Sequence, residues 1–155
     1  MINAKIVIDN VNWEKKLKKI ELFFNKVLES FPKKYQFGRK KVVLTVLLSG
    51  NKKIKQLNKK FRKKNKPTDI LSFPFKKKVS KNMTYLGDII ISYDYMNKTK
   101  SSNIYEFKDK VAKIFIHGFL HLVGFDHVKM KEFKKMNKEE SKIYKLVKKK
   151  IENFT

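Results

Sequence analysis

The sequence predicts an α+β domain in which helices pack against a small mixed β-sheet. Short β-branched segments alternate along the chain with longer segments whose apolar residues recur at helical spacing. Hydrophobic residues make up 41% of the 155 residues, which is enough for a buried core. No linker-like segment divides the sequence and no segment repeats, so we expect one domain over residues 1–155.

The chain opens with a predicted strand and a predicted helix. Residues 2–9 are short and β-branched, which favours a strand. Residues 12–30 repeat apolar side chains at helical spacing, and Asn12 stands where a helix cap is expected. The inner side of this helix is expected to carry Trp13, Leu17, Ile20, Phe24, Val27 and Leu28.

The middle of the chain predicts three more strands and one more helix. Residues 41–49 form the clearest buried strand, and residues 70–73 and 86–92 indicate two further strands. Residues 76–84 are polar and predict a connecting loop. The helix is expected to start after the Gly50-Asn51 turn, with an apolar side made of Ile54, Leu57 and Phe61.

The last third of the chain is predicted to be helical. Residues 105–123 are apolar nearly all round after Val111, which indicates a buried helix. Gly124 is the expected end of this helix, because glycine readily adopts the left-handed conformation that ends helices. Residues 130–154 predict an amphipathic, lysine-rich helix.

All three histidines lie in the segment HGFLHLVGFDH, residues 117–127. His117 and His121 are four residues apart, so a helix places both rings on one face. His127 follows the break at Gly124, and a loop there can return it toward the other two. Three neutral imidazoles around one zinc ion leave a coordination position open, as catalytic zinc sites do. The sequence therefore predicts a catalytic metal centre with one Zn²⁺ per chain, and nickel, copper and iron are the alternatives that three histidines also bind.

Gly118 distinguishes this centre from the metalloproteases that share its histidine spacing. Metzincin proteases carry a glutamate directly after the first histidine, as the general base of peptide hydrolysis. A glycine inside a helix costs about 1 kcal/mol relative to alanine. We expect a close approach of substrate or of a neighbouring strand to explain it. The metzincin-like protease is the weaker alternative.

The formal net charge of +25 favours a polyanionic partner such as RNA. Lysine supplies nearly all of this charge, and Lys, Asn, Ile and Phe are abundant together, which an A/T-rich genome also produces. The charge therefore supports RNA binding without establishing it. The chain has no cysteine, no secretion-signal pattern and no apolar run that could span a bilayer, so we expect a cytoplasmic protein without membrane attachment.

Three segments together resemble the YbeY family of bacterial metal-dependent endoribonucleases. They are residues 57–75 (LNKKFRKKNKPTDILSFPF), 86–92 (LGDIIIS) and 117–127, and they occur in the family's order and spacing. Phe125 stands where the family usually has tyrosine. The resemblance implies an endonuclease that cuts single-stranded RNA in late ribosome maturation, notably at the 3′ end of the small-subunit ribosomal RNA, and that acts in ribosome quality control.

The resemblance also implies roles for single residues. It implies that the three histidines bind zinc and that Arg62, just before the PTD motif, is catalytic. Arginine offers phosphate a bidentate pair of hydrogen bonds that lysine cannot reproduce. An arginine at a helix C-terminus also interacts favourably with the helix dipole, which is the structural alternative. Nearby lysines are expected to guide the RNA backbone through salt-sensitive contacts: Lys63, Lys64 and Lys66.

Four carboxylates near these motifs have open roles. Asp126 is expected either to orient His127 or take up a proton, or else to cap the loop. Glu140 lies on the apolar side of the last helix, where a buried carboxylate needs a partner. That partner is either the free ring nitrogen of a ligand histidine or a lysine at the domain edge, which the sequence favours. Asp69 and Asp88 are expected to have structural roles at strand ends, with support of the metal ligands as the alternative for both.

A non-catalytic assembly factor is the main rival to the nuclease. Such a protein would bind RNA and ribosomal particles, and its zinc would be structural. A weak nuclease and a binding module have similar sequences, so activity measurements must separate them.

Overall fold

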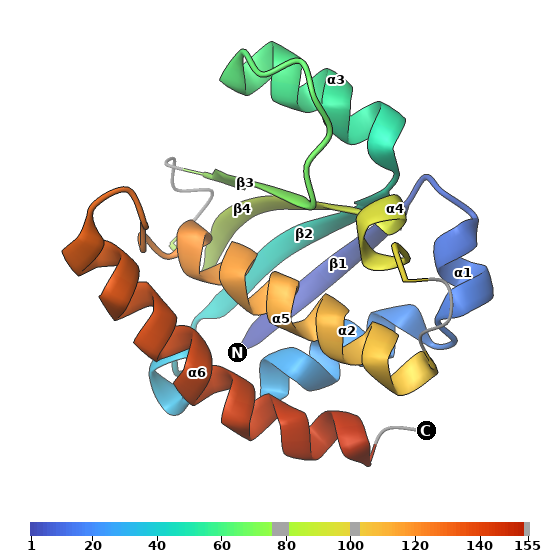
Figure 1. Ribbon diagram of the computed structural model, residues 1–155. Helices are drawn as coiled ribbons and strands as arrows, with labels where there is room; N and C mark the ends of the chain where they lie inside the picture. The colour runs from blue at the N-terminus through green and yellow to red at the C-terminus, as the bar shows by residue number, and fades with distance from the viewer. Residues whose placement is uncertain (76–80, 100–102, 154–155) are drawn as a thin grey trace.

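The computed structural model describes residues 1–75, 81–99 and 103–153. Within these residues the chain forms a mixed four-stranded sheet in the order β1-β2-β4-β3 (Figure 1). Its strands are β1 (Ile2–Ile8), β2 (Lys41–Ser49), β3 (Ile70–Pro74) and β4 (Met83–Ser92). β2 pairs in parallel with β1 and with β4, whereas β3 is an antiparallel edge strand beside β4. The predicted α+β class is confirmed.

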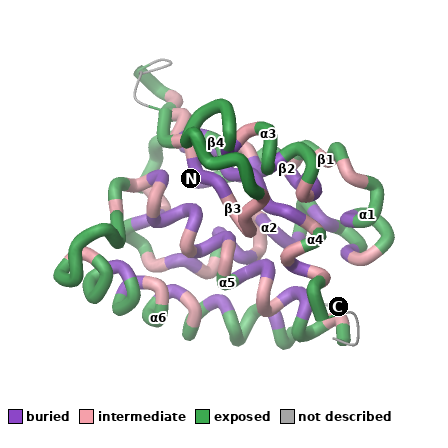
Figure 2. Tube along the Cα trace, turned by 45° about the horizontal axis from the view of Figure 1, so that its top comes forward, coloured by how far each residue is buried: buried purple, intermediate pink, exposed green. Residues whose placement is uncertain are grey.

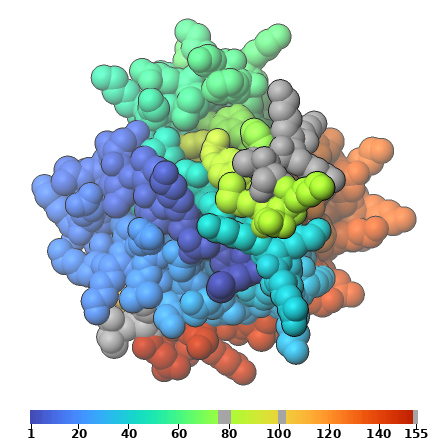
Figure 3. Space-filling view, turned by 180° about the vertical axis from the view of Figure 1, so that it is seen from behind, coloured from blue at the N-terminus to red at the C-terminus, as the bar shows by residue number. Residues whose placement is uncertain are grey.

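Helices cover the two faces of this sheet unequally. The main layer lies on one face and consists of α2 (Ile20–Glu29), α5 (Ile104–Leu122) and α6 (Met130–Glu152). α5 crosses the sheet centrally and α6 packs on α5 (Figure 1). α3 (Asn51–Arg62) lies on the other face, over β3 and β4, and stands out from the body of the molecule (Figures 1 and 3).

The core follows this division into a large and a small part. The large cluster lies between the sheet and the three-helix layer, where Phe115 and Phe119 of α5 are fully buried. The small cluster lies under α3 and consists of Ile54, Leu71 and Ile90. Buried residues therefore gather along α5 and the central strands, whereas the outer sides of α3 and α6 are exposed (Figure 2). The buried helix predicted for residues 105–123 is confirmed.

The single helix predicted for residues 12–30 is wrong. The chain forms two helices, α1 (Asn12–Lys16) and α2, and Lys19 between them has a left-handed backbone with φ of 50°. Asn12 is the first residue of α1, and Val11 occupies the cap position. The break lets the indole of Trp13 donate a hydrogen bond to the carbonyl of Ser49 while α2 packs along β1. The six predicted inner residues are all buried.

Other boundaries differ in smaller ways. β4 begins at Met83, three residues before the predicted start, and residues 76–80 of the predicted loop lie outside the described residues. Phe61 is 58% exposed and does not join the apolar side of α3, whereas Ile54 is fully buried. Two short elements were not predicted: α4 (Tyr93–Met96) and the 3₁₀ turn η1 (Lys33–Tyr35). Of the helices in the described ranges, none has the length and apolarity to cross a membrane.

Candidate metal centre and active site

The end of α5 returns the chain toward its own last turn. The amide of Gly124 donates to the carbonyl of His121 at 3.2 Å, and the amide of Phe125 donates to that of Leu120 at 2.9 Å. These two bonds form a Schellman motif, which requires a left-handed residue after the helix. Gly124 supplies it with φ of 103°. The predicted helix end is confirmed, and the loop that follows carries His127 back over α5.

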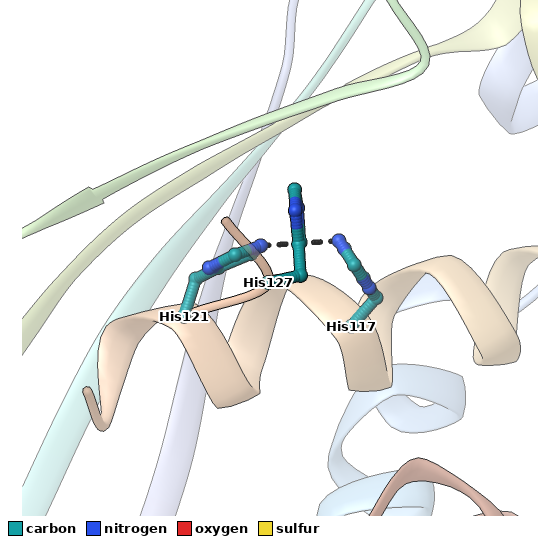
Figure 4. A group of neighbouring side chains, drawn as sticks. All are labelled: His117, His121 and His127. Atoms are coloured by element: carbon teal, nitrogen blue, oxygen red, sulfur yellow. Dashed lines mark hydrogen bonds between the residues drawn. The ribbon is translucent and has the colours of Figure 1, made fainter. Parts of the chain in front are cut away.

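The three histidines meet at this end of α5. One ring nitrogen from each of His117, His121 and His127 lies within 4.8 Å of the others. Figure 4 shows the rings of His117 and His121 facing each other from successive turns of the helix. The ring of His127, which comes from the loop after the helix, lies between them. Within the described residues, no other imidazole or carboxylate belongs to this group. The sequence-based expectation that the three rings converge is therefore confirmed.

Two of the rings are oriented through their second nitrogen. The Nδ1–H of His121 donates to the carbonyl of Phe125 at 3.0 Å, and the Nδ1 of His117 lies 2.6 Å from Oε1 of Glu140. Among the residues that the structure describes, Glu140 therefore pairs with a histidine and with no lysine, so the interpretation favoured by the sequence is wrong. Hydrogen-bonded partners of this kind fix the orientation of metal-binding imidazoles. Both Nε2 atoms are left to face the centre of the group.

The two facing nitrogens need a cation between them. Nε2 of His117 and Nε2 of His121 are 3.1 Å apart. When both Nδ1 atoms carry the proton, both Nε2 atoms are acceptors, and two lone pairs at this distance repel unless a proton or metal ion lies between them. Burial lowers the pKa of His121, and nearby His117 lowers it further, which favours the neutral form of this imidazole. Two tetrahedral zinc–nitrogen bonds separate their nitrogens by about 3.3 Å. The three-histidine group therefore fits a metal ion.

α6 is held in register by the residue before Glu140. Glu139 is only 7% exposed, and its carboxylate accepts hydrogen bonds from the hydroxyl of Tyr35 and the ammonium of Lys34, both at 2.6 Å. Burial raises the pKa of Glu139, but the bonds from Lys34 and Tyr35 lower it more, so the net shift is downward. Consecutive residues on a helix point about 100° apart. Fixing Glu139 toward η1 therefore directs Glu140 toward His117.

Gly118 lies where the edge strand approaches α5. A Cβ atom at this position would be 2.5 Å from Cδ1 of Ile70 and 3.1 Å from Oγ of Ser72. The Ser72 hydroxyl also donates to the carbonyl of Gly118 at 3.1 Å. The expected close approach of a neighbouring strand is confirmed. A glutamate here would have to displace the end of the Ile70 side chain and press against the Ser72 hydroxyl, so this packing disfavours the general base of a metzincin on α5.

A cleft of about 750 Å³ opens beside the histidines and is lined by all three of them. Its far wall is formed by the end of α3 and the loop that follows, including Arg62, Lys64 and Lys66. Lys63 is the left-handed residue that ends α3 and does not line the cleft. The guanidinium of Arg62 donates to the carbonyl of Ser72 at 3.0 Å and lies over the ring of Phe73.

The other acidic residues make local contacts. Asp126 lines the cleft and accepts a hydrogen bond from the amide of His127 at 2.7 Å, which caps the loop. Asp69 also lines the cleft, and its carboxylate accepts the amide of Ile70 at 2.8 Å. Asp88 accepts a hydrogen bond from the hydroxyl of Tyr85 and is not part of the cleft lining. These contacts agree with structural roles for Asp69 and Asp88.

Comparisons with known proteins agree with these features. A family model described as Endoribonuclease YbeY matches residues 7–148. The chain belongs to the YbeY family. Endoribonuclease YbeY of Pelagibacter ubique is 60% identical over 97% of this chain and 99% of its own length. Endoribonuclease YbeY of Neorickettsia sennetsu is 33% identical over 91% of this chain and 94% of its own length. The fold is similar to the solution structure of TM1509 from Thermotoga maritima, with a TM-score of 0.53 and 25% identity over 95% of this chain and 89% of that one.

Three contributors to the site in this YbeY-family chain were missed by sequence reasoning. Asn58 is buried, and its amide donates to the carbonyl of Lys66 at 2.9 Å, so it shapes the lysine-bearing loop. The sequence does indicate a role for Asn58, because this amide side chain stands four residues after Ile54, on the apolar side of α3. The Ser72 hydroxyl and the Phe125 carbonyl gave no such signal, because their roles depend on contacts with α5.

Proposed function

We propose that this member of the YbeY family is a zinc-dependent endoribonuclease that cuts single-stranded RNA at the three-histidine centre. The observation that carries the proposal is the pair of Nε2 atoms of His117 and His121, 3.1 Å apart beside a cleft lined with Arg62 and lysines. Zinc is the metal we propose because neutral imidazoles are among its common ligands. One ion is expected per chain.

The residues of the cleft would bind and orient the RNA backbone. Arg62 uses one N–H group on the Ser72 carbonyl, which leaves other guanidinium donors for a phosphate. Such donors stabilise the negative charge that builds on phosphoryl oxygens during cleavage. Lys64 and Lys66 add attraction that weakens as salt increases. When bound, zinc supplies a Lewis acid that polarises a phosphoryl oxygen and lowers the pKa of water.

The natural substrate we propose is ribosomal RNA during late ribosome maturation, in the cytoplasm. The expected cleavage lies near the 3′ end of the small-subunit RNA, with a further role in ribosome quality control. Family membership and the basic surface support this substrate, and the formal charge of +25 suits ribosomal particles. Deleting the gene should lead to small-subunit RNA with an unprocessed 3′ end. Normal 3′ ends in the deletion strain would contradict this substrate assignment.

Cleavage and binding must be measured on the same protein. We expect His121→Ala to reduce cleavage of a single-stranded RNA by about 1,000-fold, because the metal loses one of its three proposed ligands. Salt-dependent RNA binding should change less than about threefold, since the lysines remain. The control is Lys145→Gln, an exposed substitution on α6. If zinc-loaded wild-type protein binds RNA and never cuts it, the non-catalytic assembly factor is correct and the nuclease proposal is wrong.

A further inference from the structure

A second hollow adjoins the metal centre on the side away from Arg62. Its volume is about 520 Å³, and its lining includes Tyr95, Lys110 and Lys113. The hollow shares two lining residues, Asp69 and His117, with the main cleft. The two spaces therefore meet at a proposed metal ligand. Neither Arg62 nor the lysines of the α3 loop line the second hollow.

One face of α5 leads from this hollow to the metal centre. Lys110, Lys113 and His117 are spaced by three and four residues, which places them on one side of the helix. Lys110 and His117 are thus about 10 Å apart along the helix axis. His121 continues the same face into the main cleft. The positive charge of the hollow therefore lies on the helix face that carries the histidines. It is separate from the α3 wall of the main cleft, which consists of Arg62, Lys64 and Lys66.

The groups in the hollow suit a nucleotide. Lys110 is half-buried and has no hydrogen-bond or ion-pair partner within the described residues, whereas Lys113 lies 3.1 Å from the carboxylate of Asp109. The hydroxyl of Tyr95 donates to the carbonyl of Pro67 at 3.3 Å, and the ammonium of Lys98 lies 4.5 Å from the centre of its ring. A ring face that accepts a cation also accepts a stacked base.

The two carboxylates that line the hollow are already engaged. Glu140 contacts Nδ1 of His117, and Asp69 accepts the amide of Ile70. Both charges face donors of the protein, so they oppose a phosphate less than free carboxylates do. Lys110 and Lys113 are the lysines of this lining, and Lys113 is held near it by Asp109 and the ring of Tyr144.

We propose that Tyr95, Lys110 and Lys113, which we call the Tyr95 subsite, bind a nucleotide of the RNA on one side of the cleaved phosphate. The lysines contact its phosphate and the tyrosine ring stacks on its base. The α3 wall then binds the RNA on the other side, so the strand crosses the histidine centre from one hollow to the other. This inference rests on the proposed RNA-cleaving function of the main cleft.

The test uses a single-stranded RNA with one cleavage position, shortened one nucleotide at a time from either end. Zinc-loaded wild-type protein, Lys110→Gln/Lys113→Gln and the control Lys145→Gln/Lys149→Gln are compared at the same salt concentration. The control removes two exposed lysines of α6, so it matches the loss of charge. Binding is measured by fluorescence anisotropy and cleavage as kcat/KM.

We expect wild-type and control proteins to lose about tenfold in affinity and in kcat/KM when the nucleotide for the Tyr95 subsite is removed. With the full RNA, the affinity and kcat/KM of the Lys110→Gln/Lys113→Gln variant should be about tenfold lower than those of the wild type. Removing the nucleotide for the Tyr95 subsite should then cause no further loss, whereas shortening from the other end should act as it does in the wild type. Tyr95→Leu should show the same pattern as the double lysine variant. Tyr95→Phe keeps the aromatic ring and should respond to shortening as the wild-type protein does. Lys110→Gln alone is the second variant, because Lys110 forms no ion pair with another described residue, whereas Lys113 pairs with Asp109.

Two results separate the failure of this inference from failure of the proposed function. If the subsite variants respond to shortening as the control does, the Tyr95 subsite is wrong even though RNA is cut. If the wild-type protein binds RNA without cutting it, the proposed function is wrong, and the anisotropy series still decides whether the subsite binds a nucleotide.

Discussion

The two walls of the cleft are built in different ways. The histidine wall consists of His117 and His121 on the buried helix α5, and each ring is held through its Nδ1. The α3 wall consists of Arg62, Lys64 and Lys66, which are exposed. Coordination bonds tolerate little displacement, whereas long charged side chains can adjust to a phosphate. Changes in the histidine wall should therefore affect folding or metal binding, and changes in the α3 wall should affect RNA alone.

The largest loss of stability is expected for Gly118→Glu, which would add the glutamate of a metzincin to the histidine wall. The new side chain would have to displace the Ile70 side chain between α5 and β3, and it would bring a carboxylate into a buried space beside Ser72. We expect the free energy of unfolding to fall by about 3 kcal/mol. Urea denaturation measures it, with Gln56→Glu on the exposed side of α3 as the control. Unchanged stability, or a gain of peptidase activity, would show that β3 does not close this space.

Arg62→Lys tests the α3 wall with the charge preserved. Lysine cannot offer the planar pair of donors, so we expect kcat/KM for RNA cleavage to fall about 100-fold. The zinc content should stay at the wild-type value, because the guanidinium of Arg62 is bonded to the Ser72 carbonyl and is not one of the three proposed metal ligands. Kinetics and elemental analysis on the same preparation check both points. A loss of zinc would mean that the two walls are coupled.

Glu140→Gln tests the support of the histidine wall. The amide keeps the size of the side chain but loses the charge that orients His117, so zinc affinity should fall about 10- to 100-fold. Competition with a zinc chelator measures the affinity. Excess zinc should restore cleavage, and Glu132→Gln near the start of α6 serves as the control. Wild-type affinity in Glu140→Gln would remove this carboxylate from the site.

The smallest effect concerns Glu139 and depends on pH. Its pKa in the folded protein lies below the ordinary value of 4.5. The stabilisation is therefore present above pH 4.5 and is lost as pH falls through the folded pKa. We expect Glu139→Gln to be about 1 kcal/mol less stable than wild type at pH 7, and the difference to shrink below pH 4.

Urea titrations at several pH values provide the test. Glu29→Gln is a matched control, because Glu29 forms an exposed pair with Lys26 that should contribute nothing measurable. A Glu139→Gln variant whose stability deficit is the same at pH 3 and pH 7 would contradict the assigned ionisation.

The histidine centre could be predicted from sequence because its information is local. The spacing of His117, His121 and Gly124 places two rings on one helix face and ends the helix before the third ring. The strands could be predicted for the same reason, since their apolar patterns are continuous. The break between α1 and α2 at Lys19 could not be predicted, because the apolar spacing continues across it. Tertiary packing determines the backbone conformation there.

The support of the centre could not be predicted, because it depends on distant contacts. Glu139 and Glu140 are adjacent carboxylates on one helix, and their spacing alone does not say which one faces His117. Tyr35, 104 residues away in sequence, binds Glu139 and so leaves Glu140 to face His117. The Tyr95 subsite needs α4 beside α5, which no local pattern indicates.

The most direct test is a crystal structure of the zinc-loaded protein with anomalous diffraction recorded at the zinc edge. We predict one anomalous peak per chain, about 2.0–2.1 Å from one ring nitrogen of each of His117, His121 and His127, with no fourth side chain bound. Rings that point apart in zinc-loaded crystals, or a fourth side chain that completes the coordination, would contradict a catalytic metal at this position.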